Sequence, residues 1–244
     1  MVEKENMFPI VDIAHEKILG VGHTLCVVEW YDKLFGYKGE VDFSRITLLK
    51  NFKPCKVVLK NRRWAVAKVV GSNIHLFCTS RKEGTRGWNY QYIHHYVSVD
   101  GENFREVDII TNGSAPWVFE ENGRFYFYYH VNIDGLHNIY VKEVEDLFSL
   151  KEAVPKCILS SMNVYSAPSV LRMNSIYYIT LEYREKERSP WRTIIGKLQT
   201  PTSKIVSWKF FLDDWKACCF LHSKFITYSN KNRSFWDLRW VELK

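Results

Sequence analysis

The chain has 244 residues, of which 46% are hydrophobic and 16% aromatic, so it can bury a substantial core. No apolar run approaches the roughly 20 residues that span a bilayer, and no signal-peptide pattern opens the chain. The six cysteines form no CxxC pair and several lie in apolar runs, which favours reduced core thiols. These features predict a soluble, cytoplasmic protein without a membrane partner.

The formal net charge is +7, which could indicate an anionic partner such as nucleic acid or an acidic glycan. The basic residues are scattered, however, and the run 60–63 is the only short cluster. No stripe of Lys and Arg with interleaved aromatic residues is present. We therefore expect no nucleic-acid partner.

Similar units recur along the chain. The first starts near Asp12 and the second at Ala65, and a third starts at Ala115 with a turn at Asn122-Gly123 and a strand dense in aromatic residues. The fourth, from Ala167, aligns with the third without a gap, 52 residues further on. A weaker fifth unit starts near Ala217. A fixed period of about 50 residues is typical of a solenoid, propeller or array.

Each unit is predicted to contain four short strands, because runs of β-branched and aromatic residues are bounded by Gly, Asn, Asp or Ser. Four antiparallel strands per unit, without a helical period, indicate an all-β, five-bladed β-propeller in a single domain. The predicted blades are approximately 12–60, 65–110, 115–160, 167–211, and 217–244 completed by 7–11. The last unit has no fourth predicted strand, so we expect the N-terminal segment 7–11 to supply it and close the ring. The alternative is a frayed N-terminal tail.

Two motifs carry a resemblance to a known family. They are the Ala-Pro-x-Val and Asn-Gly-x-Phe-Tyr-x-Tyr-Tyr pattern of 115–129 and the segment 96–104, Tyr-Val-Ser-Val-Asp-Gly-Glu-Asn-Phe. With them the sequence resembles the five-bladed propeller glycosidases, glycoside hydrolase family 43 above all, with families 32, 62, 117 and 130 as structural cousins. The likeness covers roughly 12–230, and its motifs belong to the blade scaffold.

The resemblance implies a glycan site in a funnel on the propeller axis, with carboxylates opening blades one, three and four. Asp12 matches the first position. Ala115 and Ser166 stand at the other two, so two of the three usual catalytic acids are absent. No cofactor is predicted, and an axial Ca²⁺ is left open.

Other carboxylates could serve instead, because the second strand of each blade should end at the mouth where the first strand starts. The residues expected there are Glu29, Ser80, His130, Glu182 and Ser229. Glu29 and Glu182 follow apolar runs that can raise the pKa of a carboxyl group toward that of an acid catalyst. Asp12, Glu29 and Glu182 are therefore the candidate catalytic residues, although strand-end glutamates also commonly begin a solvated loop.

The loops at the mouth supply candidate substrate-binding residues. His130, Asp134 and His137 could bind a metal or position a sugar, but a solvent-facing Asp-Gly turn is favoured, and no zinc signature is present. Trp88 and the Trp191-Arg192 pair suit stacking on a sugar ring beside a hydrogen-bonding group, or ordinary loop packing. Trp117 is expected to line the pocket.

His94 and His95 lie within a strand, where alternation places one on each face, and a structural role is favoured. Together these features predict a carbohydrate-active protein, a glycoside hydrolase acting on an oligosaccharide or polysaccharide. The alternative is a non-catalytic descendant that binds a glycan or a protein partner through the same mouth. The sequence does not set the oligomeric state.

Overall fold

A computed structural model describes residues 8, 17–21, 24–40, 44–81, 91–186, 189–213, 215–222, 225–232 and 235–242. Side chains are described for these residues except 17–21 and those from 212 onward. The regular elements within these ranges are strands, apart from one short 3-10 helix, η3 (Leu147–Ser149). No helix in this part of the chain is both long and apolar enough to cross a membrane.

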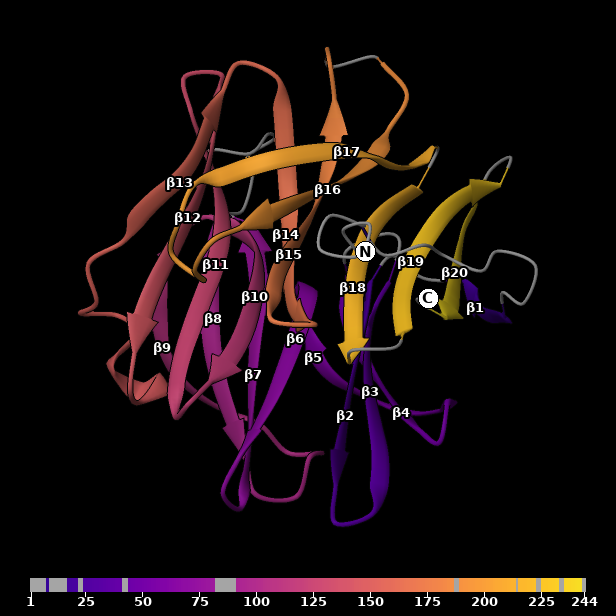
Figure 1. Cartoon of the computed structure of the whole chain (residues 1–244). Coiled ribbons are helices and arrows are strands. Elements are labelled where there is room, and N and C mark those ends of the chain that lie inside the picture. The colour runs from indigo at the N-terminus through magenta and orange to yellow at the C-terminus, as the bar shows by residue number, and fades with distance from the viewer. Residues whose placement is uncertain are drawn as a thin grey trace.

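Four sheets are each built from four consecutive antiparallel strands (Figure 1). The first contains β2 (Thr24–Trp30), β3 (Lys33–Gly39), β4 (Arg45–Lys50) and β5 (Lys53–Lys60). The second contains β6 (Arg63–Val70), β7 (Asn73–Arg81), β8 (Gln91–Ser98) and β9 (Arg105–Asn112). The third contains β10 (Ser114–Glu121), β11 (Arg124–Ile133), β12 (Leu136–Val144) and β13 (Lys156–Ser161). The fourth contains β14 (Val164–Met173), β15 (Ile176–Arg184), β16 (Arg192–Leu198) and β17 (Ile205–Asp213). We call these sheets blades one to four.

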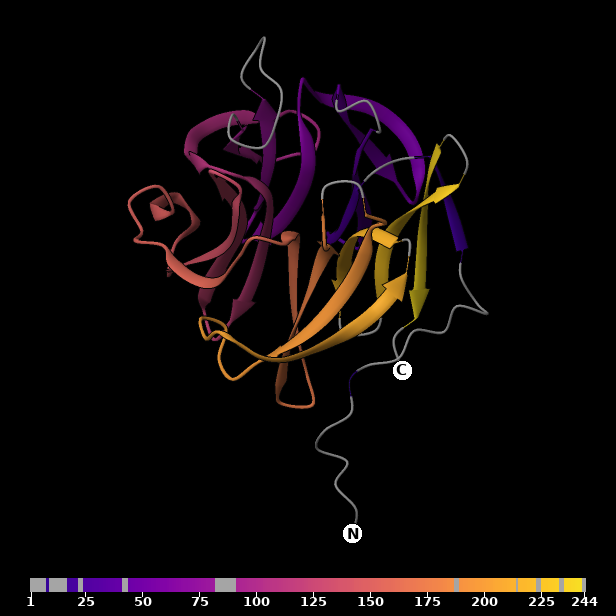
Figure 2. The same cartoon turned by 90° about the horizontal axis from the view of Figure 1, so that it is seen from above.

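The remaining strands form a composite sheet in the order β1-β20-β19-β18. It joins β18 (Trp215–His222), β19 (Phe225–Asn232) and β20 (Phe235–Glu242) to β1 (Lys17–Val21), which pairs with β20. The first strand of each sheet contacts the first strand of the next, in the order β2, β6, β10, β14, β18 and back to β2. Seen from above, the sheets surround a common axis (Figure 2).

The fold predicted from the sequence, five blades with the boundaries given above, is corrected by this arrangement. The structure shows a propeller with four blades of consecutive strands, and the composite sheet is described by its backbone alone. The strand that completes that sheet is β1, whereas the predicted closing segment 7–11 lies outside the described residues except for Phe8. Phe8 packs on blade four, with its ring 6.2 Å from Tyr178 and 4.7 Å from the Lys197 ammonium.

A tight turn explains why blade one starts later than predicted. Tyr31 and Asp32 both adopt left-handed backbone angles (φ 47° and 56°) and connect β2 to β3. Two consecutive residues in this conformation form the hairpin turn whose twist matches that of the strands. The segment 24–30 is therefore the first strand of its blade and not, as predicted, the second.

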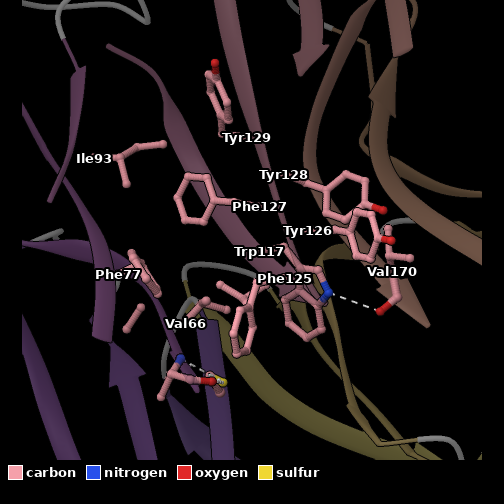
Figure 3. Close-up of a cluster of buried hydrophobic side chains, with 14 of the residues drawn as sticks. Val66, Phe77, Ile93, Trp117, Phe125, Tyr126, Phe127, Tyr128, Tyr129 and Val170 are labelled. Carbon is pink, nitrogen blue, oxygen red and sulfur yellow. Dashed lines mark hydrogen bonds between the residues drawn. The ribbon is translucent and has the colours of Figure 1, made fainter. Parts of the chain in front are cut away.

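The core lies between the faces of adjacent blades. Strand β11 supplies five consecutive buried aromatic residues, which alternate between the two faces of blade three (Figure 3): Phe125, Tyr126, Phe127, Tyr128 and Tyr129. Phe127 meets Phe77 of blade two edge to face at 5.0 Å. On the other side, Trp117 donates its indole N–H to the Val170 carbonyl of blade four at 3.1 Å. Because the first two strands of blade three, β10 and β11, pack on the two neighbouring blades, they join three blades into one core.

Candidate functional site at the mouth of the propeller

The mouth is the end of the propeller where the first strand of each blade starts and the second strand ends. Blades two, three and four are built alike there. Arg63 pairs with Thr79, Ser114 with His130 and Ser166 with Glu182, and each pair is followed by a β-bulge. An extra residue in a bulge turns the following side chain toward a new direction. The bulge therefore repeats one geometry in three blades.

The residue after each of these first positions has a left-handed backbone: Trp64 (φ 54°), Ala115 (φ 52°) and Ala167 (φ 49°). These three side chains are buried and contact one another. The equivalent positions in blades two, three and four are therefore Arg63, Ser114 and Ser166. In each blade, the next residue belongs to the buried cluster. Ala115 and Ser166, which were both compared with the family's acids, are not equivalent to each other.

Glu182 is the buried carboxylate of the mouth, with 1% of its surface exposed. Ser166 Oγ donates a hydrogen bond to Glu182 Oε2 at 2.7 Å. Arg63 lies close enough to interact with the carboxylate electrostatically and donates a hydrogen bond to Gln91 Oε1. Burial and the neighbouring Arg81 charge lower the pKa of Arg63 to about 10, and Glu182 opposes this shift. The mouth thus contains a buried acidic and a buried basic side chain.

A chain of hydrogen bonds runs through blade three beside these charges. Gly135 N–H donates to Asn132 Oδ1 at 3.1 Å, which turns the Asn132 amide nitrogen toward His137 Nε2 at 2.9 Å. His137 Nδ1 must then carry the proton shared with His130 Nε2 at 2.9 Å. His130 Nδ1 in turn donates to Ser114 Oγ at 3.2 Å.

This chain requires both rings to be neutral, because a second proton on His130 would point at the His137 N–H. The same conclusion follows from the electrostatics. Burial, with contributions from His137 and Arg63, lowers the pKa of His130 to about 3. Burial also lowers the pKa of His137. His130 therefore acts as a fixed hydrogen-bonding group and not as a cation at neutral pH.

A pocket of about 370 Å³ opens at the rim of the mouth on blade four. Its lining includes an acidic, a basic and two aromatic side chains: Tyr183, Glu185, Ser189, Pro190, Arg192 and Phe210. The Arg192 guanidinium lies 4.7 Å from the centre of the Phe210 ring. Trp208 packs edge to face on Phe210 at 5.5 Å, and both rings remain about half exposed. The pocket therefore borders an exposed aromatic surface with charged groups beside it.

A second cation–aromatic pair of blade four acts electrostatically on the hydrogen-bonded chain of blade three. The Arg184 guanidinium lies 4.3 Å from the Trp191 ring centre, and the Arg184 charge contributes to the lowered pKa of His137. Arg184 is two residues after Glu182 on β15, so it projects from the same face of that strand. Polar side chains therefore follow blade four from Glu182 to the pocket.

The structure brings some of the predicted site residues together. Glu182 and His130 lie at the mouth, and Trp191 and Arg192 lie beside the blade-four pocket. Asp134 is exposed in the β11–β12 turn, with φ 51°. Asp12 and Trp88 lie outside the described residues.

Glu29 and Trp117 lie elsewhere than predicted. Thr24, the first residue of β2, lies at the mouth near the Trp64 backbone, because both border the same side of Gly39. Glu29 is five residues further along this strand. At about 3.3 Å per residue this is about 16 Å from the mouth, and Glu29 is exposed beside the β2–β3 turn. Trp117 is buried in the core and faces blade four, because the bulge after Ser114 turns it away from the mouth.

Sequence reasoning missed several residues of the mouth. Ser114 and Ser166 recur 52 residues apart, and that repeat could have identified them as equivalent positions. Trp208 and Phe210 alternate along β17, a period-2 pattern that places both on one face. Arg63 was read as part of a short basic cluster, and no sequence signal marks it as buried. Among the described residues, no group of three or more His, Cys, Asp or Glu could hold a metal ion.

Comparison with known proteins defines the class of fold. No protein-family model matches the chain, and no curated protein matches its sequence. Solved structures do match, and among them are glycoside hydrolases of family 43, whose fold this all-β propeller shares.

Three of these structures are similar over nearly their full lengths. A thermostable family-43 glycoside hydrolase has a TM-score of 0.71 at 15% identity, covering 92% of this chain and 88% of that one. The GH43 endo-arabinanase from Bacillus licheniformis has a TM-score of 0.73 at 10% identity, covering 93% and 96%. The α-L-arabinanase of Cellvibrio cellulosa, complexed with arabinohexaose, has a TM-score of 0.71 at 10% identity, covering 93% of each chain. At these identities the likeness is one of fold.

Proposed function

We propose that the protein is carbohydrate-active and binds an oligosaccharide at the mouth of the propeller, from Glu182 outward to the blade-four pocket. The observation that carries the proposal is the position of this pocket. Tyr183, which lines it, directly follows Glu182 on β15, and Arg192 lies opposite Tyr183 on β16. Aromatic faces beside charged hydrogen-bonding groups suit the apolar faces and hydroxyl edges of sugars.

The fold is compatible with this use of the mouth. One structure with the same fold, the Cellvibrio cellulosa arabinanase, was determined with arabinohexaose. Because one fold can support many functions, this likeness supports a carbohydrate ligand without identifying it. The intracellular location and the lack of a nucleic-acid partner remain predictions from composition.

We further propose that the protein acts as a glycoside hydrolase, with Glu182 as one of the two required carboxyl groups. One group protonates the leaving oxygen while the other activates water or attacks the sugar. The buried position of Glu182 suits a group that acts on a substrate held away from bulk water. Asp12, which the resemblance suggests and which lies outside the described residues, remains the candidate for the second group.

Non-catalytic glycan binding is the second candidate function. It is favoured by the cluster of Trp64, Ala115 and Ala167, which puts one aromatic and two small apolar side chains at the starts of blades two to four. In this case Glu182, held by Ser166, would accept hydrogen bonds from sugar hydroxyls and perform no proton transfer.

Two measurements on the same variants separate these functions. Binding of an oligosaccharide panel that includes arabinohexaose and xylo-oligosaccharides is measured by calorimetry, and hydrolysis by the release of reducing ends. For a hydrolase, Glu182→Gln should lose hydrolysis while keeping affinity, because Gln can still accept the Ser166 hydrogen bond. For a binding protein, wild type should bind without hydrolysis.

A matched control and a negative outcome complete this design. Glu145→Gln, on an exposed residue after β12, should change neither quantity. Arg192→Ala should weaken binding for either function, because Arg192 lines the pocket. If wild type binds no oligosaccharide in the panel, the proposal is wrong.

A further inference from the structure

Blade two contains a second chemical site, on three neighbouring strands. The site consists of Ser80 on β7, His94 on β8 and Glu106 on β9. His94 pairs with Cys78, two residues before Ser80, and Glu106 pairs with Tyr96, two residues after His94. Since directly paired residues share a face and side chains alternate along a strand, all three project from one face of the sheet.

The distances join them into one hydrogen-bonded line. Ser80 Oγ lies 2.7 Å from His94 Nε2, and His94 Nδ1 lies 2.8 Å from Glu106 Oε1. A neutral imidazole satisfies both contacts when its Nδ1–H donates to the carboxylate and its Nε2 accepts the serine proton. This is the arrangement in which a histidine can deprotonate a serine while a carboxylate orients the ring.

The carboxylate is itself held in place. Tyr96 donates its hydroxyl proton to Glu106 Oε2 at 2.9 Å, and Arg62 Nε donates to the Tyr96 oxygen at 3.0 Å. The Arg62 guanidinium also lies 3.8 Å from Glu106. Both carboxylate oxygens are therefore engaged, which fixes the ring of His94 behind Ser80.

Burial and two neighbouring charged groups, Arg62 and Glu106, also set the protonation of His94. Burial lowers its pKa, Arg62 lowers it further, and the hydrogen bond to Glu106 opposes both. His94 is consequently neutral at pH 7 and can accept a proton. Ser80 is only partly buried and Glu106 is exposed, so both ends of the hydrogen-bonded line reach the surface of the blade.

We infer that Ser80, His94 and Glu106 form a nucleophilic site for the hydrolysis of esters of small carboxylic acids. Ser80 Oγ bonds to the ester carbonyl carbon as its proton passes to His94 Nε2. The ester C–O bond then breaks, and His94 returns the proton to the departing alcohol. In the second half, water attacks the acyl-serine with its proton taken by His94. The acid leaves as Ser80 recovers that proton, so all atoms balance.

Two other histidines of the propeller differ from His94, because neither has a serine on one ring nitrogen and a carboxylate on the other. His130 also contacts a serine, Ser114, but its second ring nitrogen faces His137 and not a carboxylate. His95 projects from the opposite face of β8, where it stacks on Phe77 at 4.5 Å and hydrogen-bonds to His75. The structural role expected for His94-His95 from the sequence therefore fits His95, whereas His94 has the partners of a general base.

The direct test is covalent labelling of the full chain with an alkyl fluorophosphonate, read by intact mass and peptide mapping. We expect one adduct, on Ser80, and hydrolysis of p-nitrophenyl acetate that the same reagent abolishes. Because mapping needs no variant, the test does not depend on the folding of a mutant. A folded wild-type protein that takes up no label, or takes it up on another residue, overturns the inference.

Variants then test the roles of the three residues. Ser80→Ala should abolish labelling, and His94→Gln should slow it by about 10³-fold. Glu106→Gln should slow it less, with the pH dependence of labelling shifted, because the ring loses its charged partner. Ser160→Ala, which changes an exposed strand serine, is the matched control and should label like wild type. Equal labelling in His94→Gln and wild type would contradict the assignment.

Discussion

Ser166 Oγ donates a hydrogen bond of 2.7 Å to Glu182 Oε2, across the first two strands of blade four. The equivalent pair in blade three, Ser114 and His130, is hydrogen-bonded in the opposite direction, since His130 Nδ1 donates to Ser114 Oγ at 3.2 Å. A serine at the start of the first strand therefore holds a titratable side chain at the end of the second, in two neighbouring blades. The chemistry of the mouth depends on this repeated position.

Removal of the serine hydroxyl in blade four should destabilise the protein. Ser166→Ala takes a hydrogen bond away from a buried carboxylate, and we expect the free energy of unfolding to fall by about 1–3 kcal/mol. Urea denaturation measures the change, with Ser160→Ala, an exposed serine, as the control. Equal stability of the two variants would contradict the contact.

Trp117 should matter for stability and not for sugar binding. Trp117→Phe keeps an aromatic ring in the core but removes the N–H that donates to the Val170 carbonyl. We expect a loss of about 1–2 kcal/mol in the free energy of unfolding and no change in oligosaccharide affinity. Weaker binding at wild-type stability would instead place Trp117 in the pocket, as the sequence suggested.

Stability should fall as the pH is lowered from 7 to 5. Burial is the first cause of a lowered pKa in every histidine with a described side chain: His75, His94, His95, His130 and His137. The unfolded chain takes up protons below about pH 6.5, whereas folded His95 and His130 stay neutral down to about pH 3. Because the unfolded state binds more protons in this window, the free energy of unfolding decreases with falling pH.

The size of this effect can be measured by denaturation at several pH values. For His130 alone we expect a loss on the order of 1–2 kcal/mol between pH 7 and pH 5. His95→Phe should flatten the profile, because a phenyl ring can pack with Phe77 and Phe148 without titrating. Identical slopes for this variant and wild type would show that His95 is not buried as a neutral ring.

The left-handed alanines offer a test of the bulges. A residue with a side chain pays roughly 1 kcal/mol for this backbone conformation, which glycine adopts freely. Ala115→Gly and Ala167→Gly should therefore leave stability unchanged or raise it by up to about 1 kcal/mol. Ala67→Gly, within the same kind of strand but without a positive φ, should lose about 1 kcal/mol. A loss of that size in all three variants would argue against the bulges.

The sequence predicted an all-β propeller, although not its number of blades, because strand signals are local. Asn122-Gly123 marks a two-residue turn, and the run after it alternates between two buried faces, so the hairpin of blade three could be placed. The same reasoning failed in blade one. Tyr31-Asp32 turns as tightly as Asn-Gly, but its composition does not indicate a turn, and the first blade was therefore shifted by one strand.

The site was harder to predict than the fold, because it depends on register and on contacts between distant strands. Glu182 could be placed at the end of its strand. The bulge that follows the Ser166 and Glu182 pair, and the bulge that turns Trp117 into the core, cannot be recognised from the composition. The hydrogen-bonded line of blade two depends on the pairing of three strands, which the sequence does not specify. Ser80 and His94 are 14 residues apart in the chain, and His94 and Glu106 are 12 apart.

The central claim is that an oligosaccharide binds at the mouth beside blade four. Calorimetric titration of the oligosaccharide panel into wild type and Phe210→Ala tests it most directly, because Phe210 is about half exposed and borders the pocket. We predict binding by wild type and about 10-fold weaker binding by the variant at equal melting temperature, since the loss of one stacking ring costs about 1 kcal/mol or more. Equal affinity in both proteins, or no binding by wild type, would contradict a glycan site at this position.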